Sequence, residues 1–195
     1  MLLLAWIACV EPAPEDSSSE VEADADADSD SDSDTDSDAD TDPHEVGRVL
    51  PPFALVDLNP SSSTYEQVVD SEQLLGSSFA LVFLDSRCLA CKDVTADLWA
   101  QYEANPGWWE LLPTYAVESI GGAAVPEGIE PMVEGNDMPY LADTEEVLLW
   151  QGYEALNHDF YVVSTEGTLE AWLPLYTWPE DLEQFTTYMS LRFPD

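Results

Sequence analysis

The pattern of apolar and polar residues divides the chain into an N-terminal quarter without core material and a longer part rich in predicted strands and helices. Six of the seven Trp residues and every Phe and Tyr lie at position 53 or later. Short apolar runs between turn signals predict strands there, and apolar residues at helical spacing predict helices. The predicted strands cover residues 53–57, 64–69, 79–84, 114–117, 160–163 and 168–172, and the predicted helices cover residues 88–104, 145–153 and a segment that begins at Pro179.

The most uniform of these runs is Phe79–Leu84, which is apolar at all six positions. Such a run is typical of a central strand that is covered on both faces. Asp85 and Ser86 follow and are common N-cap residues, so the helix over residues 88–104 is expected directly after the strand. Asn105-Pro106-Gly107 then predicts the end of that helix.

The second half of the chain carries further signals, and the strongest of them is a hairpin. Residues 121–137 contain several Pro and Gly residues and predict a long connection. Asp143 and Glu146 have the spacing of a capping box, which predicts the start of the helix over residues 145–153. Glu166-Gly167 between two strand signals predicts an antiparallel hairpin. The resulting order is β-β-β-α-β-α-β-β-α, an α/β arrangement.

Acidic residues dominate the charge of the chain. There are 41 Asp and Glu residues against four Lys and Arg residues, which gives a formal net charge of −37. Sixteen of the acidic residues lie between Glu11 and Glu45, so 25 acidic and four basic residues remain from Gly47 onward, a charge of −21. Nucleic acid is excluded as a partner, because phosphate binding needs clustered cations. The negative charge favours solubility and cationic partners, or it is an adaptation to a salty habitat.

The N-terminus begins with an apolar run that ends in a small residue followed by Cys9. Residues 1–9 resemble the end of a bacterial lipoprotein signal, in which Cys9 would be lipidated and become the mature N-terminus. This predicts a protein that is lipid-anchored in a bacterial membrane, outside the cytoplasm. A plain or truncated export signal, or a terminus without such a role, is the alternative. The run is too short to span a bilayer as a helix, which takes about 20 residues.

Residues 10–46 predict a disordered acidic linker. Asp occupies every second position from Asp24 to Asp42, and nothing in this segment can bury apolar surface. Neighbouring charges lie within the Debye length of about 8 Å, so their repulsion should keep the segment extended. Alternating Asp residues also begin a calcium-binding loop, but the Gly and Glu that an EF-hand loop requires at its sixth and twelfth positions are missing. A spacer is therefore preferred.

Cys88-Leu89-Ala90-Cys91-Lys92 stands between the buried strand and the helix after it. With the order of elements, this motif resembles the redoxin branch of the thioredoxin superfamily over roughly residues 52–193. Residues 139–143 and 160–163 and Glu166-Gly167 also resemble the second half of redoxins. The resemblance implies that residues 47–195 form a three-layer thioredoxin-like domain, in which helices flank a central mixed sheet and the N-terminal strands are an extension.

The two cysteines suit dithiol chemistry. A Cys at a helix start faces unpaired backbone N–H groups, which favour its thiolate, and a second Cys three positions later can resolve a mixed disulfide. Cys88 is therefore the expected nucleophile and Cys91 the resolving thiol, and Arg87 and Lys92 are expected to give electrostatic support. This predicts a monomeric thiol-disulfide oxidoreductase that acts on protein thiols and disulfides without a cofactor. A structural disulfide or two buried thiols are the plain alternative.

Three departures from the family pattern leave other functions open. Arg87 stands where thioredoxins usually have Trp, Val82 stands where they have a buried acid, and His158 lies at or beside their cis-Pro position. The copper chaperones of cytochrome oxidase assembly are tethered redoxin-fold proteins that bind Cu(I) through two Cys and one His. By this resemblance, Cys88, Cys91 and His158 form an alternative Cu(I) site, since Cu(I) favours soft ligands. A redoxin-fold binding module without catalysis is the third possibility.

Overall fold

A mixed five-stranded sheet forms the centre of the computed structural model, which describes residues 42–194. Cys9, the predicted signal segment and the predicted linker up to residue 41 lie outside the described residues. In sheet order, the strands are β5 (Tyr140–Ala142), β4 (Thr114–Glu118), β3 (Phe79–Leu84), β6 (Asp159–Val163) and β7 (Leu169–Pro174). The β3–β4 and β4–β5 pairs are parallel, and the β3–β6 and β6–β7 pairs are antiparallel. The predicted α/β fold with a central mixed sheet is confirmed.

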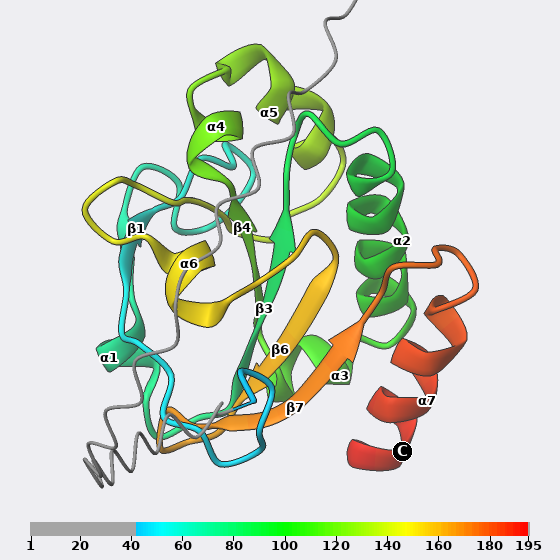
Figure 1. Cartoon of the computed structure of the whole chain (residues 1–195). Coiled ribbons are helices and arrows are strands. Elements are labelled where there is room, and N and C mark those ends of the chain that lie inside the picture. Colours follow the sequence, from blue (N-terminus) through cyan, green and yellow to red (C-terminus); the bar gives the residue numbers. More distant parts are fainter. Residues whose placement is uncertain (1–41, 195) are drawn as a thin grey trace, which may run out of the picture. The chain divides into compact units, whose positions relative to one another are not determined.

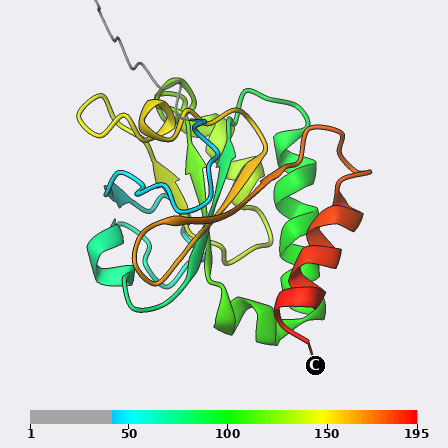
Figure 2. The same ribbon diagram turned by 60° about the horizontal axis from the view of Figure 1, so that its bottom comes forward.

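Two layers cover the sheet (Figures 1 and 2). On one face lie α2 (Cys91–Ala104), α3 (Pro106–Leu111), α5 (Pro126–Val133) and α7 (Leu182–Arg192), packed on alternate residues of β3. On the other face lie the hairpin of β1 (Ala54–Val56) and β2 (Val68–Asp70) and the short helix α6 (Leu149–Tyr153). All six residues of β3 are buried, as its uniform apolar run predicts.

The segment before and within the hairpin contacts both edges of the sheet. Val49 forms a bridge with Thr168 beside β7, and Asp57 forms a bridge with Leu141 of β5. The N-terminal extension therefore shields strand edges that could otherwise pair with other chains. His44, from the end of the predicted linker, stacks on Trp172 with ring centroids 3.7 Å apart, so this residue lies against the domain.

The predicted helix after β3 begins later than its sequence suggests. The helix α2 starts at Cys91, not at Cys88, because residues 85–88 form a turn in which the Cys88 N–H donates to the Asp85 carbonyl. The Asp85 carboxylate accepts from the Arg87 N–H at 2.8 Å, so it caps this turn and not the helix. At the other end, Asn105 terminates α2 as predicted, and Pro106 opens α3 at once.

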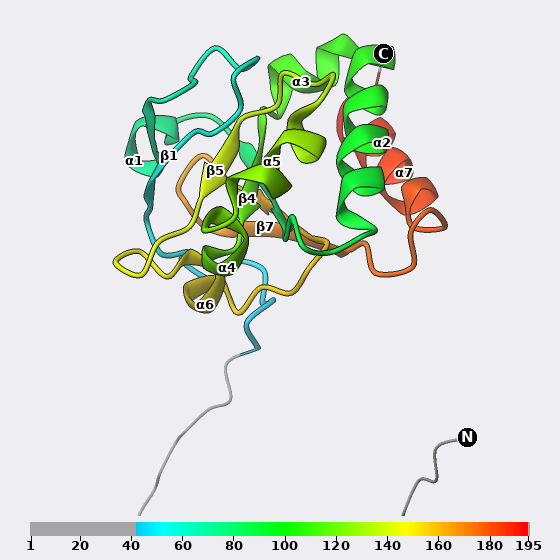
Figure 3. The same cartoon turned by 90° about the horizontal axis from the view of Figure 1, so that it is seen from above.

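The connection predicted over residues 121–137 contains two helices, α4 (Ile120–Ala123) and α5, which Figure 3 shows from above together with α6. The helices α1 (Ser71–Leu74) and α4 and the strand β5 have only three or four residues each, too few for a recognisable pattern. None of the helices among residues 42–194 is long and apolar enough to cross a bilayer.

Two other predicted helix starts are also wrong. The helix α6 begins at Leu149, and the Asp143 carboxylate reaches it across a turn by accepting from the Leu149 and Trp150 N–H groups at 2.9 and 3.0 Å. Asp143 therefore caps α6 from six residues away, without the predicted capping box. The last helix, α7, begins at Leu182 after an Asp181 N-cap, so Pro179 lies before the helix.

Candidate functional site

The two cysteines lie where β3 gives way to α2, and they differ in exposure. Cys91 is the first residue of α2 and is fully buried, whereas Cys88 precedes the helix and is partly exposed. Both thiols are free, and the Asp85 N–H donates to Cys91 Sγ at 3.5 Å. The arrangement offers one thiol to a partner and keeps the other directly beneath it.

His158 faces both sulfurs from the loop between α6 and β6. Its Nε2 lies 3.2 Å from Cys91 Sγ and 3.6 Å from Cys88 Sγ. The His158 N–H donates to the Phe83 carbonyl at 2.8 Å, and the His158 carbonyl accepts from the Leu175 N–H at 3.0 Å. The φ angle of His158 is 73°, far from the value near −65° to which proline is restricted, so proline would not fit this backbone. Three sequence-predicted residues thus meet at one point.

Burial keeps the inner groups of this cluster neutral. It raises the pKa of the Cys91 thiol, and the contact with Cys88 raises it further. Burial also lowers the pKa of His158, against a hydrogen bond to the Leu175 backbone and the charge of Asp159, which both raise it. At neutral pH the structure therefore pairs a protonated Cys91 with an uncharged imidazole.

The two cations of the motif have different surroundings. Arg87 forms a two-pronged ion pair with Asp85, with Nη2 2.6 Å from Oδ2 and Nε 2.9 Å from Oδ1. This hydrogen bond holds the pKa of Asp85 at about 2. Lys92 is exposed at the second position of α2. The Arg87 charge is therefore balanced by Asp85, which limits the support that Arg87 can give to a Cys88 thiolate.

Glu118 is a buried acid beside the cysteine loop, and it was not among the residues predicted from the sequence. It ends β4, and its carboxylate accepts from the Ser86 N–H at 3.0 Å and from the Tyr140 hydroxyl at 2.8 Å. Burial raises its pKa. Its position at the end of an apolar strand could have identified it. Neighbouring parallel strands end at the same edge of a sheet, so the end of β4 lies beside the end of β3 and the cysteines. Glu118 anchors the loop that carries Cys88.

Tight packing at Gly122 gives a stability prediction. A Cβ at Gly122 would overlap Glu118 Oε1 and lie 2.9 Å from Ser86 Oγ. Gly122→Ala should therefore lower the free energy of unfolding by about 1–3 kcal/mol, the usual cost of overpacking. Gly107→Ala is the matched control, since a Cβ there meets nothing within 4 Å, and it should be neutral or stabilising. Urea unfolding of both variants checks this, and equal effects would contradict the packing.

The different exposure of the two thiols predicts an order of modification. In the reduced protein at mild pH, iodoacetamide should label Cys88 well before Cys91, because Cys91 is buried and burial raises its pKa. Mass spectrometry of the peptides would follow each cysteine separately. Equal rates, or faster labelling of Cys91, would show that the assigned order of the thiols is wrong.

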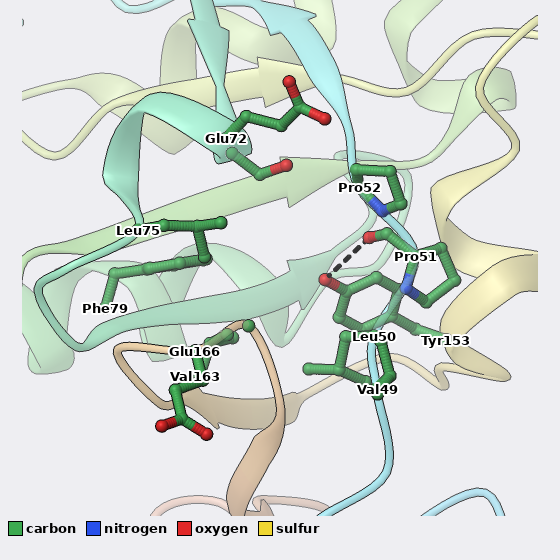
Figure 4. A pocket seen from close by; sticks show the side chains of 12 residues that line it. Val49, Leu50, Pro51, Pro52, Glu72, Leu75, Phe79, Tyr153, Val163 and Glu166 are labelled. Atoms are coloured by element: carbon green, nitrogen blue, oxygen red, sulfur yellow. Dashed lines mark hydrogen bonds between the residues drawn. The ribbon is translucent and has the colours of Figure 1, made fainter.

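A separate pocket lies at the opposite end of β3 from the cysteines (Figure 4). Phe79, Leu75 and Val163 contribute apolar surface, and the Tyr153 hydroxyl donates to the Pro51 carbonyl at 3.3 Å. Its ionisable side chains are the acids Glu72 and Glu166 and the phenol of Tyr153. This pocket offers no nucleophile comparable to the dithiol.

The sequence matches no protein-family model and no curated protein. Solved structures do match the chain. The thioredoxin domain of a thiol-disulfide oxidoreductase from Bacteroides vulgatus superposes with a TM-score of 0.54 at 17% identity, over 74% of this chain and 96% of that one. A secreted Mycobacterium tuberculosis disulfide oxidoreductase homologous to Escherichia coli DsbE gives 0.52 at 15% identity, over 71% and 95%.

A third similar structure has a metal. Copper-bound ScoI from Bradyrhizobium japonicum superposes with a TM-score of 0.54 at 13% identity, over 72% of this chain and 99% of that one. At these identities the similarity concerns the fold, whereas the function has to be argued from the site. Together with the sheet order and the strand–loop–helix junction at the cysteines, these matches show that the described residues have a thioredoxin-like fold.

Proposed function

We propose that the domain carries out thiol–disulfide exchange with protein thiols and disulfides through Cys88 and Cys91. The observation that supports this most is the pairing of a partly exposed thiol with a buried thiol three residues later, after a central strand. An exposed sulfur can attack a partner, and a buried sulfur one turn away can release it.

The exchange proceeds in two steps. The Cys88 thiolate attacks a substrate disulfide, which forms a mixed disulfide and releases one substrate sulfur. Cys91 then loses its proton and attacks Cys88 Sγ, which closes the intramolecular disulfide and frees the second substrate sulfur as a thiol after it takes up a proton. The substrate gains two electrons and the dithiol loses two. The reverse sequence oxidises a substrate dithiol.

A turnover assay tests this function. The full chain should accelerate the reduction of a protein disulfide by dithiothreitol, whereas a Cys88→Ala/Cys91→Ala double variant should match the uncatalysed rate. Equal rates for the two proteins would contradict the proposal. Circular dichroism of the double variant controls for folding.

Cu(I) binding is a second candidate, and the position of His158 favours it. One ligand atom from each of Cys88, Cys91 and His158 lies within 4.8 Å of the others. Two sulfurs and an imidazole nitrogen suit Cu(I) in softness, so these residues fit the ion and would hold it. Competition of the reduced protein against a Cu(I) chelator would test this, and failure to take up the metal would exclude it.

We also propose that the domain acts outside the cytoplasm, tethered to a membrane through lipidation of Cys9. The apolar run that ends at Cys9 supports this, and so does the secreted oxidoreductase with the same fold. Cys9→Ala should move the protein from the membrane fraction to the soluble extracytoplasmic fraction. Unchanged partitioning of the variant would contradict the tether.

A further inference from the structure

Asp159 follows the site histidine along the chain, and donors outside the cysteine loop bind its carboxylate. The residue is fully buried. Its Oδ1 accepts from Trp172 Nε1 at 2.9 Å and from the Tyr176 hydroxyl, and its Oδ2 accepts from the Leu156 N–H at 2.7 Å. Three donors from three separate segments thus converge on one carboxylate.

These bonds close the turn that contains His158. The Asp159 N–H donates to the Leu156 carbonyl at 3.1 Å, so backbone and side chain both tie residue 159 to residue 156. Within this turn His158 has a φ of 73°, a conformation that costs most residues about 1–3 kcal/mol and persists only where the surroundings fix it. Trp172 and Tyr176 attach the turn to β7 and to the segment after it.

The side-chain donors to Asp159 have supporting interactions of their own. The ring of His44 stacks on Trp172 at 3.7 Å between centroids, with 16° between the planes. Burial and the bond to Asp159 raise the pKa of Tyr176, so its hydroxyl keeps the proton that it donates. A buried carboxylate is costly unless fully hydrogen-bonded, and this one has its donors supplied.

We propose that Asp159 is a positioning residue that holds the His158 imidazole against both cysteine sulfurs and thereby sets the reduction potential of the Cys88–Cys91 pair. His158 Nε2 can accept a hydrogen bond from a thiol but not from a disulfide, which has no proton to donate. The contact therefore stabilises the reduced form, and a stabilised reduced form makes a dithiol pair more oxidising. This inference rests on the proposed exchange function.

The test is a double-mutant cycle on the potential, measured against glutathione buffers. Asp159→Asn should shift the equilibrium constant toward the disulfide by about tenfold, which is about 30 mV more negative. In a His158→Asn background the same substitution should add no shift, because its effect passes through the imidazole. An equal shift in both backgrounds, or none in the first, would overturn the inference.

Further variants separate positioning from stability. Tyr176→Phe is the alternative variant if Asp159→Asn does not fold. It removes one donor to Asp159, keeps the aromatic ring, and should shift the reduction potential in the same direction. Asp57→Asn is the matched control: Asp57 is fully buried and accepts from Ser62, Thr64 and the Tyr140 N–H at the β5 edge. It should lower the melting temperature and leave the potential unchanged.

The inference and the proposed function fail in different ways. The glutathione equilibrium is measured without a protein substrate. If the protein shows no turnover but Asp159→Asn still shifts the reduction potential as expected, only the proposed function is contradicted. If Cys88 and Cys91 form no disulfide, the proposed function is contradicted. The NMR chemical shifts of the His158 ring nitrogens in the reduced protein then still report the position of the imidazole. Identical His158 spectra in wild type and Tyr176→Phe would then contradict the inference.

Discussion

Cys91→Ser should trap the protein as a mixed disulfide with its substrate, whereas Cys88→Ser should trap nothing. The buried residue 91 resolves the intermediate, so its loss stops the reaction after the first step. The partly exposed Cys88 starts the reaction, so its loss removes covalent capture altogether. Non-reducing electrophoresis and intact mass after mixing with a disulfide substrate measure this difference.

In protein that has not been lipidated, Cys9 has a free thiol, which requires a control in these experiments. Both variants should therefore also be prepared with Cys9→Ala, so that any captured partner belongs to the Cys88–Cys91 pair. Comparable capture by Cys88→Ser in this background would show that Cys91 can act as the nucleophile. That result would reverse the roles derived from the exposure of the two thiols.

For the Cu(I) hypothesis, His158→Asn should weaken metal binding by at least about 100-fold. Loss of a residue that only hydrogen-bonds to a metal ligand already lowers metal affinity by about 10–100-fold, and this substitution removes a ligand itself. Asn is the substitution of choice because it tolerates the positive φ of 73° at this position. Affinity is measured by competition of the reduced protein with a Cu(I) chelator.

Asn157→Ala is a matched control for this experiment. The Cys91 thiol donates to Asn157 Oδ1 at 3.9 Å, so this neighbour contacts the cluster through a weak hydrogen bond only. Its removal should change Cu(I) affinity far less than His158→Asn does. Similar losses in both variants would show that the loop as a whole, and not the imidazole, accounts for binding.

Much of the sheet could be predicted because its strands carry strong local signals. The uniform apolar run over residues 79–84 matches β3 at both ends, and the hairpin around Glu166-Gly167 matches β6 and β7 to within two residues. In contrast, α4 and α5 contain Gly121, Gly122, Gly128 and Pro131, which indicate a loop. Both helices pack on the Ser86 loop, and α5 also buries Ile129 and Met132 in the core. These contacts are tertiary, so the local sequence does not reveal them.

The site was predictable to a similar extent. The cysteine motif is local, and His158 was identified by resemblance to redoxins. Glu118 and Asp159 were not, since a buried acid is stabilised by donors that are distant in sequence, such as Tyr140 and Trp172. The pairing of Arg87 with Asp85 likewise depends on the turn that the chain makes before α2.

The proposed exchange requires that Cys88 and Cys91 form a reversible disulfide. Redox titration of the Cys9→Ala protein in glutathione buffers, followed by mass spectrometry of thiol-blocked samples, measures this directly. We expect one two-electron transition, in which the blocking reagent modifies both cysteines together in reducing buffer and neither cysteine in oxidising buffer. Independent titration of the two thiols, or thiols that stay reduced throughout, would contradict it.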